Sequence, residues 1–498
     1  MLGSENQFSM NEVRTTGRLA VPTLLCSLLL CGSSFAGTVD YFTDNGYGNP
    51  LSTLQHPCAE HYKGVTYIAY QGPHEDPYVC AYDHAARKWS GPVKAGNNPM
   101  GRTPDTVDPK RIDNHGRPAM IIDGKGHIHL IFGGHGGNFG LGRNALGTPG
   151  KGKQTHVVTR RPADISAWEV VENVDPFGTY SQFVKMDDGD IYLFYRHGSH
   201  RSDWVYQKST NNCMAFAPPV SLLKHKAQEA DPNIHDAWYA WFEKGKGDTI
   251  TASYVYHPCR VTGHTKERYN GYYMQMNCRD ESWSNASGDA LAVPVTKEYA
   301  DKNTLVCNTA RERSNHGTCR VDDDGHPHLF FRQGPGQVRY YRWLGSAWQE
   351  PVAVIGELKS QDGDMAVESP KVVRMLLTQG NSGGGEVCWW KTTDGGLTWG
   401  KESCLITSPN SSYVASTLVR NAHPDARMVV SEHNRAQNHL YRKLFLLGDS
   451  GLVGRSEAEA SNLGDRLKNL EAVQPGPKPG KAGKKGRNKS REEDDGDE

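Results

Sequence analysis

Tyrosine, histidine and arginine residues stand near the ends of short β-type segments, at matched distances from the turns between them. Tyr180 and Arg196 lie at equal distances on either side of one predicted turn, and His115 and His135 flank another in the same way. The two strands of a hairpin pair about their turn, so residues equidistant from it are expected to face each other. The sequence therefore predicts a Tyr–Arg pair and a His–His pair at the open ends of two hairpins.

Two further hairpins carry pairs of the same kind. The same symmetry sets Tyr239 against His257 and His316 against Arg332. A single Tyr or His at a strand end is usually only hydrogen-bonded or solvated, but four pairs at equivalent positions of consecutive repeats favour a shared site. We expect the four hairpin ends to converge on one face of the molecule.

This set of side chains suits chemistry on an acidic polysaccharide. The cations could hold a carboxylate or a sulfate, and the Tyr and His side chains could move protons. Glycoside hydrolases normally use two carboxylates that flank the scissile bond, and the cluster offers no evident Asp or Glu pair. The residues instead favour β-elimination at a uronic acid, in which the carboxylate is neutralised and the weakly acidic C5 proton is removed.

Tyr180 and Arg196 have the side chains that this elimination needs. An arginine can bind a carboxylate through two parallel hydrogen bonds and stabilise the enolate-like intermediate. A Tyr or His takes the C5 proton, and a neighbour protonates the leaving O4 atom. A tyrosine base requires a lowered pKa, and Arg196 supplies the cation expected to lower the pKa of Tyr180.

A glycine-led strand recurs along the chain and predicts the fold that would position these pairs. The first six copies are spaced 58 to 78 residues apart, and their alternation of apolar and polar residues indicates strands. The copies begin at Gly64, Gly126, Gly189, Gly247, Gly325 and Gly385, with a weaker seventh at Met428–Ser431. One four-stranded blade per copy predicts an all-β, seven-bladed β-propeller.

Turn and cysteine patterns support the same architecture. The segment from Thr392 to Trp399 resembles the Asp-box repeats of sialidase-like propellers, in which an aspartate stabilises a tight turn. Cys388 and Cys404 flank this turn symmetrically and predict a cross-strand disulfide, as expected for an exported protein. Cys307 and Cys319 form a second candidate pair.

The two ends of the chain differ from the repeats. An apolar run over Leu19–Leu30 and a small-residue site ending at Ala36 predict an export signal, so the mature protein is expected outside the cytoplasm, periplasmic or extracellular. Lys+Arg and Asp+Glu both number 56, and we expect neither nucleic-acid binding nor membrane insertion. The predicted organisation is a signal peptide over 1–36, the propeller over 37–455 and an extension over 456–498 that is disordered from 473.

The motifs around these residues resemble the ulvan lyases of polysaccharide lyase family 25. The resemblance covers residues 40–455, and the spacing of Tyr180 and Arg196 is its most specific part. The local motifs are Asp-Asn-His115-Gly, Gly-Gly-His135-Gly, Thr-Tyr180-Ser-Gln, Tyr-Arg196-His-Gly and Trp-Tyr239-Ala-Trp.

The resemblance implies a secreted, monomeric enzyme that acts on ulvan. The substrate would alternate rhamnose-3-sulfate with glucuronic or iduronic acid, and cleavage would leave a 4,5-unsaturated uronate. Tyr180 would act as the base and the acid, and Arg196, helped by His115, would neutralise the carboxylate. His135 and Tyr239 would position the sugar or move a proton. His235 is an alternative to Tyr239 on the same strand.

A structural zinc site is also implied. His257 and Cys259 would lie on one face of a strand, His264 follows in the adjoining loop, and His200 comes just after Arg196. Four nitrogen and sulfur ligands suit tetrahedral zinc. Cys278 is a further candidate, although hairpin pairing would put it at the far end of the strand.

Two other functions compete with the lyase. A sialidase-like glycoside hydrolase is suggested by the Asp-box together with Arg196 and Arg332. A non-catalytic carbohydrate-binding propeller would use the same face without turnover. Only the lyase predicts a product that absorbs in the ultraviolet.

Overall fold

The computed structural model describes most of the chain from Thr38 to Ala460. The described residues are 38–99, 114–135, 144, 146, 153–261, 265, 267–334, 336–355, 363–381, 384–433, 442–457 and 459–460. The predicted signal peptide and the tail from residue 473 lie outside them. The chain divides into two compact units, Met1–Gly37 and Thr38–Glu498. Within the described ranges, no helix is long and apolar enough to cross a bilayer.

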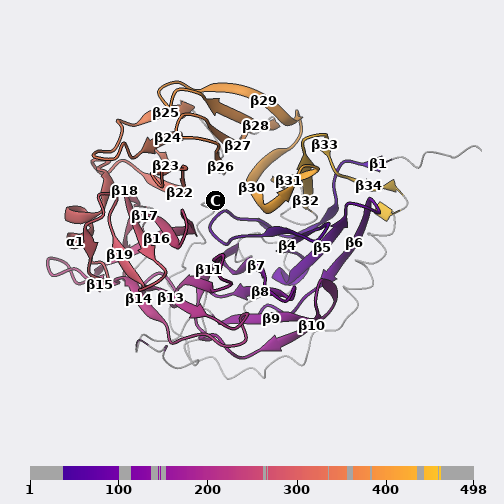
Figure 1. Ribbon diagram of the computed structural model, residues 1–498, viewed down its shortest axis with the longest axis horizontal. Helices are drawn as coiled ribbons and strands as arrows, with labels where there is room; N and C mark the ends of the chain where they lie inside the picture. The colour runs from indigo at the N-terminus through magenta and orange to yellow at the C-terminus, as the bar shows by residue number, and fades with distance from the viewer. Residues whose placement is uncertain are drawn as a thin grey trace, which may run out of the picture. The chain divides into compact units, whose positions relative to one another are not determined.

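Four of the antiparallel sheets are separate and have four strands each (Figure 1). The first contains β7 (Ala119–Ile122), β8 (Ile128–Gly133), β9 (Gln154–Arg161) and β10 (Asp164–Val171). The second contains β11 (Thr179–Lys185), β12 (Ile191–Arg196), β13 (Trp204–Ser209) and β14 (Val220–Leu223). The third contains β22 (Ser314–Val321), β23 (Pro327–Gln333), β24 (Gln337–Arg342) and β25 (Val352–Ile355). The fourth contains β26 (Gly363–Val367), β27 (Val373–Asn381), β28 (Gly384–Thr392) and β29 (Gly400–Ser408).

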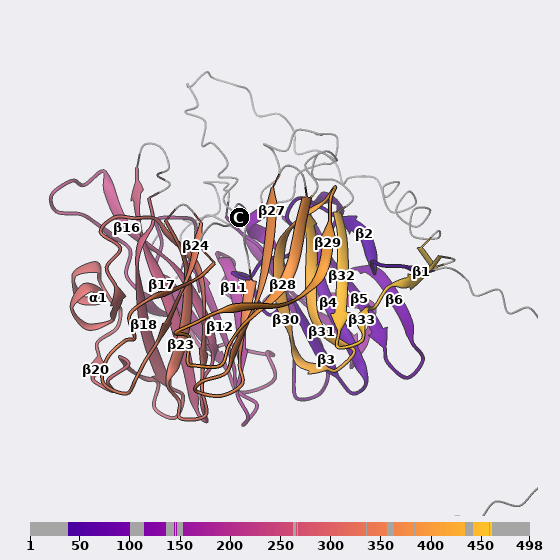
Figure 2. The ribbon, with the colours of Figure 1, turned by 90° about the horizontal axis from the view of Figure 1, so that it is seen from above.

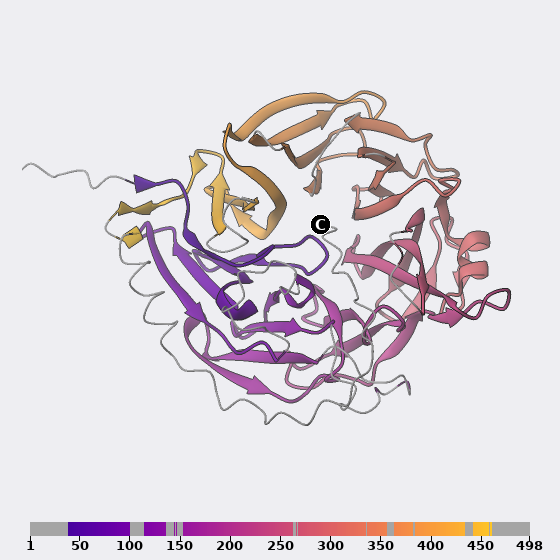
Figure 3. The ribbon, with the colours of Figure 1, turned by 180° about the vertical axis from the view of Figure 1, so that it is seen from behind.

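Two larger sheets complete the arrangement. The seven-stranded sheet contains β15 (Lys226–Ala227), β16 (Ile234–Lys244), β17 (Thr249–Arg260), β18 (Tyr269–Asn277), β19 (Ser282–Ser284), β20 (Ala290–Leu291) and β21 (Leu305–Cys307), beside the helix α1 (Lys297–Asn303). The nine-stranded sheet contains β2 (Thr43–Gly46), β3 (Ala59–Tyr62), β4 (Val65–Gln71), β5 (Pro77–Asp83), β6 (Lys88–Lys94), β30 (Ser412–His423), β31 (Ala426–His433), β32 (Arg442–Gly448) and β33 (Gly451–Leu452). The strands β1 (Thr38–Val39) and β34 (Arg455–Ser456) pair separately, as Figure 3 shows from behind.

The predicted all-β, propeller-like arrangement is confirmed, but seven separate blades are not. The sheets succeed one another around a common centre in chain order (Figure 1), and only four of them stand alone with four strands. Two features of the strand pairing explain why seven separate blades are not seen. A single parallel pair, Glu60 with Arg420, joins the first and last groups of strands, and β15, β20 and β21 enlarge the sheet of β16–β19.

The repeat glycines explain why the hairpins turn where they do. Gly126 has φ +92° and Gly189 has φ +95°, a region that favours glycine because other residues carry a Cβ atom. The sixth predicted copy is out of step, because Gly385 lies inside the third strand of its sheet, β28, and not at a turn between the first two. The seventh copy, Met428–Ser431, lies in the strand β31.

Aromatic side chains pack the sheet of β11–β14 against the sheet of β15–β21. The rings of Phe194 and Phe242 stack with centroids 4.0 Å apart and an angle of 9° between their planes. Trp204 packs against Phe242 at 5.8 Å and donates its indole N–H to the carbonyl of Trp238 at 2.7 Å. These contacts pack the sheet of β11–β14 against the hairpin β16–β17.

Charged side chains link the innermost strands of three consecutive sheets. Glu243 of β16 pairs with Arg320 of β22 at 2.6 Å, and Arg320 pairs with Asp364 of β26 at 2.8 Å. His56 lies 3.4 Å from Glu243. Burial alone would raise the pKa of Glu243, but Arg320, His56 and Arg420 outweigh it and lower that pKa.

We expect Glu243→Gln to destabilise the fold by about 3 kcal/mol at neutral pH, because Arg320 would lose a partner in a poorly solvated position. A carboxyl group with a lowered pKa stabilises the fold above its unfolded pKa, and this contribution disappears as the pH falls through the folded pKa. Urea unfolding of wild type and variant should therefore differ at neutral pH and converge in acid. Glu229→Gln, which removes the exposed partner of Lys226, is the control and should have almost no effect.

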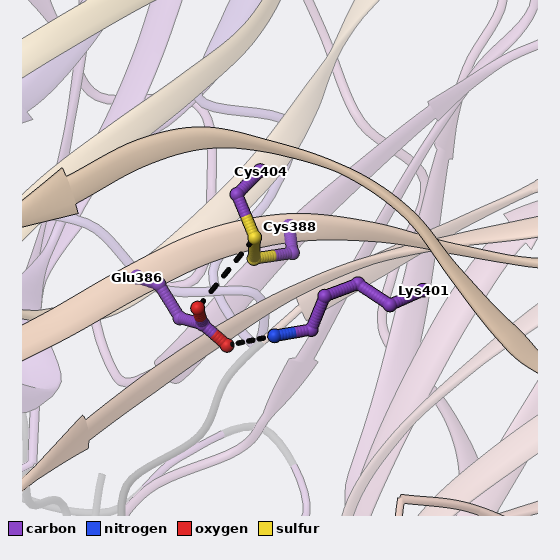
Figure 4. Close-up of a disulfide and its surroundings, with 4 residues drawn as sticks. All are labelled: Glu386, Cys388, Lys401 and Cys404. Carbon is purple, nitrogen blue, oxygen red and sulfur yellow. Dashed lines mark hydrogen bonds and ion pairs between the residues drawn. A yellow bond between two sulfur atoms is a disulfide. The ribbon is translucent and has the colours of Figure 1, made fainter.

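The predicted disulfide between Cys388 and Cys404 is present (Figure 4). The two residues are direct cross-strand partners on β28 and β29, with Cα atoms 4.0 Å apart. Lys401 and Glu386 pair beside it at 2.5 Å. The second predicted bridge is wrong. Cys307 and Cys319 are both free thiols, because β21 pairs Cys307 with Gly271 while Cys319 is buried in β22.

The Asp-box turn forms as predicted. One carboxylate oxygen of Asp394 accepts the backbone N–H groups of Leu397 and Thr398, both at 3.0 Å. The other accepts the hydroxyl of Thr398 at 2.6 Å. These hydrogen bonds lower the pKa of Asp394. The motif closes the loop before β29 and is remote from the cluster described next.

Candidate active site

The predicted His–His pair forms at the open end of the first hairpin of the site. The imidazoles of His115 and His135 stack with centroids 3.5 Å apart and planes 18° apart. The hairpin register, in which Ala119 faces Ile131, is the one that the turn symmetry requires. His115 lies in the short 3-10 helix η3 (Asn114–Gly116), and its ring meets that of Tyr180 edge-on at 5.6 Å.

Tyr180 and Arg196 also meet, but not as strand partners. Arg196 faces Thr179, because a register shift between Thr179 and Gln182 adds a residue to β11. Tyr180 lies in this bulge with φ +62°, a conformation that is costly for a bulky residue and clusters at functional sites. The guanidinium of Arg196 lies 4.7 Å from the centre of the Tyr180 ring. Both side chains are buried, with 3% and 0% exposure for Tyr180 and Arg196.

Tyr239 belongs to the cluster, but its cross-strand partner is not the predicted one. It faces Val255 across β16 and β17, whereas His257 faces Ala237, so the predicted register is wrong. The long turn after Lys244 displaces the centre of symmetry by one residue. The ring of Tyr239 nevertheless lies 5.5 Å from Tyr180. It also lies 5.6 Å from His257.

His235, the alternative to Tyr239 on its own strand, lies elsewhere. His235 stacks on His225, and their ring nitrogens are 2.7 Å apart. Trp238 is fully buried and donates its indole N–H to the carbonyl of Lys224 at 2.9 Å. Tyr239 is therefore the residue of this strand that contacts Tyr180.

The residues of the fourth predicted pair are not direct cross-strand partners. A register shift between Asn315 and Gly317 leaves Arg332 facing Asn315 instead of His316. Arg332 is half-buried near the end of β23. The side chain of His316 lies outside the described atoms.

Arg268 also belongs to the cluster, although no sequence pattern predicts it there. It precedes β18 in an irregular segment that follows no repeat. Its Nη2 atom donates a hydrogen bond to the Tyr239 hydroxyl at 3.1 Å, and its guanidinium lies 4.5 Å from the centre of that ring. Arg196 lies on the same ring at 5.4 Å. Tyr239 thus lies between two guanidinium groups.

The pKa values of the two tyrosines are shifted in opposite directions. Burial raises the pKa of Tyr180 well above its usual value, and Tyr239 raises it further, although Arg196 and Arg268 act against this. Burial also opposes ionisation of Tyr239, but Arg268 and Arg196 outweigh it and lower the pKa of Tyr239. A hydrogen bond between the two hydroxyls stabilises the ionised form of Tyr239. Arg196 acts to lower the pKa of Tyr180, as expected, but burial outweighs it, so the net lowering that a tyrosine base requires is not found at Tyr180. Of the two phenols, Tyr239 is the one whose pKa is lowered.

The guanidinium of Arg196 is the least satisfied polar group of the cluster. Its Nε, Nη1 and Nη2 atoms are buried and make no hydrogen bond within the part of the chain that the structure describes. A buried arginine normally has hydrogen-bonding partners. The cluster therefore provides a cation that can accept an anion, and phenols that can exchange a proton.

Three predicted metal ligands lie together beside these residues. Single ligand atoms of His200, His257 and Cys259 lie within 4.8 Å of one another. The Nδ1 atom of His257 is 2.8 Å from the carbonyl oxygen of Glu267, which places the proton on Nδ1 and the lone pair on Nε2. His264, the fourth predicted ligand, lies outside the described residues. Cys278 lies at the opposite end of its hairpin, where its N–H donates to the carbonyl of Asp248.

The metal candidates contact the catalytic candidates directly. The Nε2 atoms of His200 and His135 are 2.8 Å apart. The donor set of two imidazoles and one thiol fits zinc and neighbouring divalent metals. An ion held there would brace His135 and the wall of the cluster behind Tyr239.

Known proteins match this chain over most of its length. A family model described as a BNR repeat-containing family member matches residues 65–353. An ulvan lyase of Nonlabens ulvanivorans is 44% identical over 444 residues, which cover 86% of this chain and 93% of that protein. An ulvan lyase of Alteromonas sp. (strain LOR) is 43% identical and covers 84% of this chain and 88% of its own length.

Solved structures agree with the sequence relatives. A polysaccharide lyase PL25 ulvan lyase superposes with a TM-score of 0.81 at 41% identity, over 86% of this chain and 99% of that chain. A second structure of that kind, bound to -[GlcA(1-4)Rha3S]-, superposes with a TM-score of 0.79 at 40% identity and the same coverage. The extent of these matches shows that the chain is a polysaccharide lyase and belongs to the PL25 ulvan lyase family.

Proposed function

We propose that the protein cleaves ulvan by β-elimination at the bond between rhamnose-3-sulfate and glucuronic or iduronic acid, and leaves a 4,5-unsaturated uronate. The observation that carries the proposal is the buried guanidinium of Arg196, which lies on the rings of Tyr180 and Tyr239 and lacks a partner within the described residues. A uronate carboxylate is a well-matched acceptor for it. The structure of a relative with -[GlcA(1-4)Rha3S]- supports the choice of substrate.

The reaction requires one proton to leave C5 and one to reach O4. Arg196, with His115, neutralises the carboxylate and thereby acidifies C5. Tyr180, having passed its own proton to the Tyr239 phenolate, takes the C5 proton as the C4–O4 bond breaks. The electron pair from C5 forms the C4–C5 double bond, and O4 leaves with a proton returned by Tyr180. No external reagent is consumed.

The remaining site residues are assigned to substrate binding. His135 positions the sugar beside His115, and Tyr239 holds the charge of the phenol pair. We assign His316 and Arg332, in the next group of strands, to contacts with more distant sugar residues of the chain. Arg332 is suited to a sulfate or a second uronate because its charge is permanent.

The acidities of the tyrosine pair predict the pH dependence of the enzyme. The value of kcat/KM should rise with pH as the pair loses a proton, because the base form is then populated. Tyr239→Phe removes the phenol whose pKa is lowered and leaves Tyr180, whose pKa burial raises. We expect the rising limb to move to higher pH by about one unit or more, measured from initial rates across a pH series.

The matched control for that series is Tyr206→Phe. Its hydroxyl, on β13, donates to Glu281 in the turn between β18 and β19, and not to a residue of the cluster. The control should keep the wild-type profile. If the rising limb of the pH profile does not shift in the Tyr239→Phe enzyme, the two tyrosines do not share one negative charge, and Tyr180 ionises alone.

A structural zinc ion is part of the proposal. His200, His257 and Cys259 would hold it together with His264. When bound, zinc would supply structural cross-linking of the loops around the cluster. The chain's own residues carry out the proton transfers.

The decisive assay is incubation of the purified protein with ulvan while ultraviolet absorbance is recorded. The lyase predicts growing absorbance from the unsaturated uronate. New reducing ends without absorbance would identify a sialidase-like hydrolase instead, and binding without any product would identify a carbohydrate-binding propeller. Family membership favours elimination over both.

We further propose seven blades and export from the cell. The nine-stranded sheet is held together between β3 and β30 by one pair of residues, so it is best divided into two blades of four strands, with the short β33 added to the blade of β32. The seven-stranded sheet then counts as one blade with additional short strands. The disulfide between Cys388 and Cys404 is consistent with an oxidising compartment, and we expect the exported protein to be a monomer.

A further inference from the structure

A second group of metal-binding side chains lies where the first and last strand groups meet. His61 is in β3, His84 follows β5, and His423 ends β30, with Asp425 in the next turn. β3 and β30 run side by side, as the parallel pair of Glu60 and Arg420 requires (Figure 2). The group is at the turn end of its hairpins, whereas the active-site residues are at the open ends of theirs.

The chain departs from regular strand geometry to bring His423 there. The register of β30 and β31 shifts between Leu418 and His423. Asn421 has φ +53° within this shift. The bulge lets His423 lean across to the neighbouring group of strands, where its ring lies 3.9 Å from that of His84.

The three imidazoles form one cluster. The ring of His61 is 5.1 Å from that of His84 and 5.4 Å from that of His423. Single ligand atoms of His84, His423 and Asp425 lie within 4.8 Å of one another. The Nδ1 atom of His423 and the Oδ2 atom of Asp425 are 3.9 Å apart, close to the roughly 3.4 Å that separates two ligands of a tetrahedral zinc ion.

One nitrogen of His84 is already oriented for a ligand. The Nε2 atom of His84 is 2.9 Å from the hydroxyl oxygen of Thr66, which is also 3.3 Å from His61 Nδ1. The Nδ1 atom of His84 is buried and has no hydrogen-bond partner within the described residues. A second-shell contact at one nitrogen and an available lone pair at the other is the arrangement found in metal-binding histidines.

An ion can reach the group from the solvent. His423 and Asp425 are 34% and 52% exposed, so an ion could reach them.

We propose that His84, His423 and Asp425 bind a divalent transition-metal ion that clamps the first strand group to the last. Two nitrogen donors and one carboxylate suit zinc, cobalt, nickel or copper and not the harder calcium. The ion would take the place of the Asp425 amide, which now donates to His423 Nδ1 at 3.1 Å. Water would complete the coordination.

Cobalt titration of the full-length enzyme, after chelation and without an affinity tag, separates this site from the one containing Cys259. Cobalt at Cys259 gives a thiolate charge-transfer band, whereas a site of imidazole and carboxylate does not. We expect His423→Ala and His84→Ala each to bind one equivalent less than wild type, with any thiolate band unchanged. We also expect metal to raise the Tm of wild type more than that of either variant.

The finer test compares two aspartates of adjacent turns. Asp425→Asn removes a proposed ligand, and Asp449→Asn removes a similarly exposed carboxylate that pairs with Arg427. We expect affinity at this site to fall about tenfold or more in the first and to stay at the wild-type value in the second. If both histidine variants keep the wild-type number of metal equivalents and the wild-type gain in Tm, the proposal is wrong.

Discussion

Tyr180→Phe is expected to reduce turnover of ulvan by about 10³- to 10⁴-fold, because one hydroxyl group serves in two proton transfers and each is typically worth 10²- to 10⁴-fold. The replacement removes a single oxygen atom. The phenyl ring keeps its place beside Trp204, where the rings lie 6.4 Å apart and almost parallel, and under the guanidinium of Arg196. The fold and the substrate affinity should therefore change little.

The measurement is the initial rate of absorbance growth over a range of ulvan concentrations. We expect kcat to fall and KM to stay within a few-fold of wild type, since the lost hydroxyl acts in the transition state. Tyr195→Phe is a suitable control. Its buried hydroxyl donates to Gln207 at 2.7 Å on the other side of the strand, and it should cost less than tenfold. A Tyr180→Phe enzyme with more than a tenth of wild-type turnover would refute the role of Tyr180.

The parts of the site that depend on regular hairpins could be predicted from the sequence. His115 and His135 meet because the strands around Gly126 follow the simple register set by their turn. Tyr180 and Arg196 were found by the same argument, although their actual register differs by one residue. The two side chains still meet because each is long enough to span that difference.

Irregular backbone explains what the sequence could not predict. The bulges at Tyr180 and His316 add a residue without any mark in the pattern of apolar residues. Arg268 comes from a segment outside the repeats, so symmetry could not bring it to Tyr239. The cluster of His61 with its neighbours requires knowledge of how the first and last strand groups meet.

The acidity of Tyr180 was mispredicted for a different reason. The sequence shows a nearby cation but not the depth of burial. The side chain is 3% exposed, and desolvation outweighs the attraction of Arg196. Arg196 and Arg268 act to lower the pKa of both tyrosines. They outweigh burial only at Tyr239, whose hydroxyl also accepts a hydrogen bond from Arg268.

Arg196→Lys is expected to lower kcat/KM on ulvan by about 10²- to 10³-fold, the loss typical of removing one electrostatic stabiliser of a developing negative charge. Lysine keeps the positive charge but cannot offer two parallel N–H groups to a carboxylate. Arg196→Ala should lose at least as much.

The comparison of the two variants separates two roles for this arginine. If Arg196 acted only as a nearby charge that favours a phenolate, lysine would restore most of the activity lost in the alanine variant. If it binds the uronate carboxylate, lysine restores little, and Arg196→Lys leaves the pH profile nearer to wild type than Tyr239→Phe does. The same guanidinium is buried and lies 4.7 Å from the Tyr180 ring, so both variants need a thermal unfolding check. Near-complete rescue by lysine would leave charge alone as the contribution of Arg196 and would move carboxylate recognition to His115 and its neighbours.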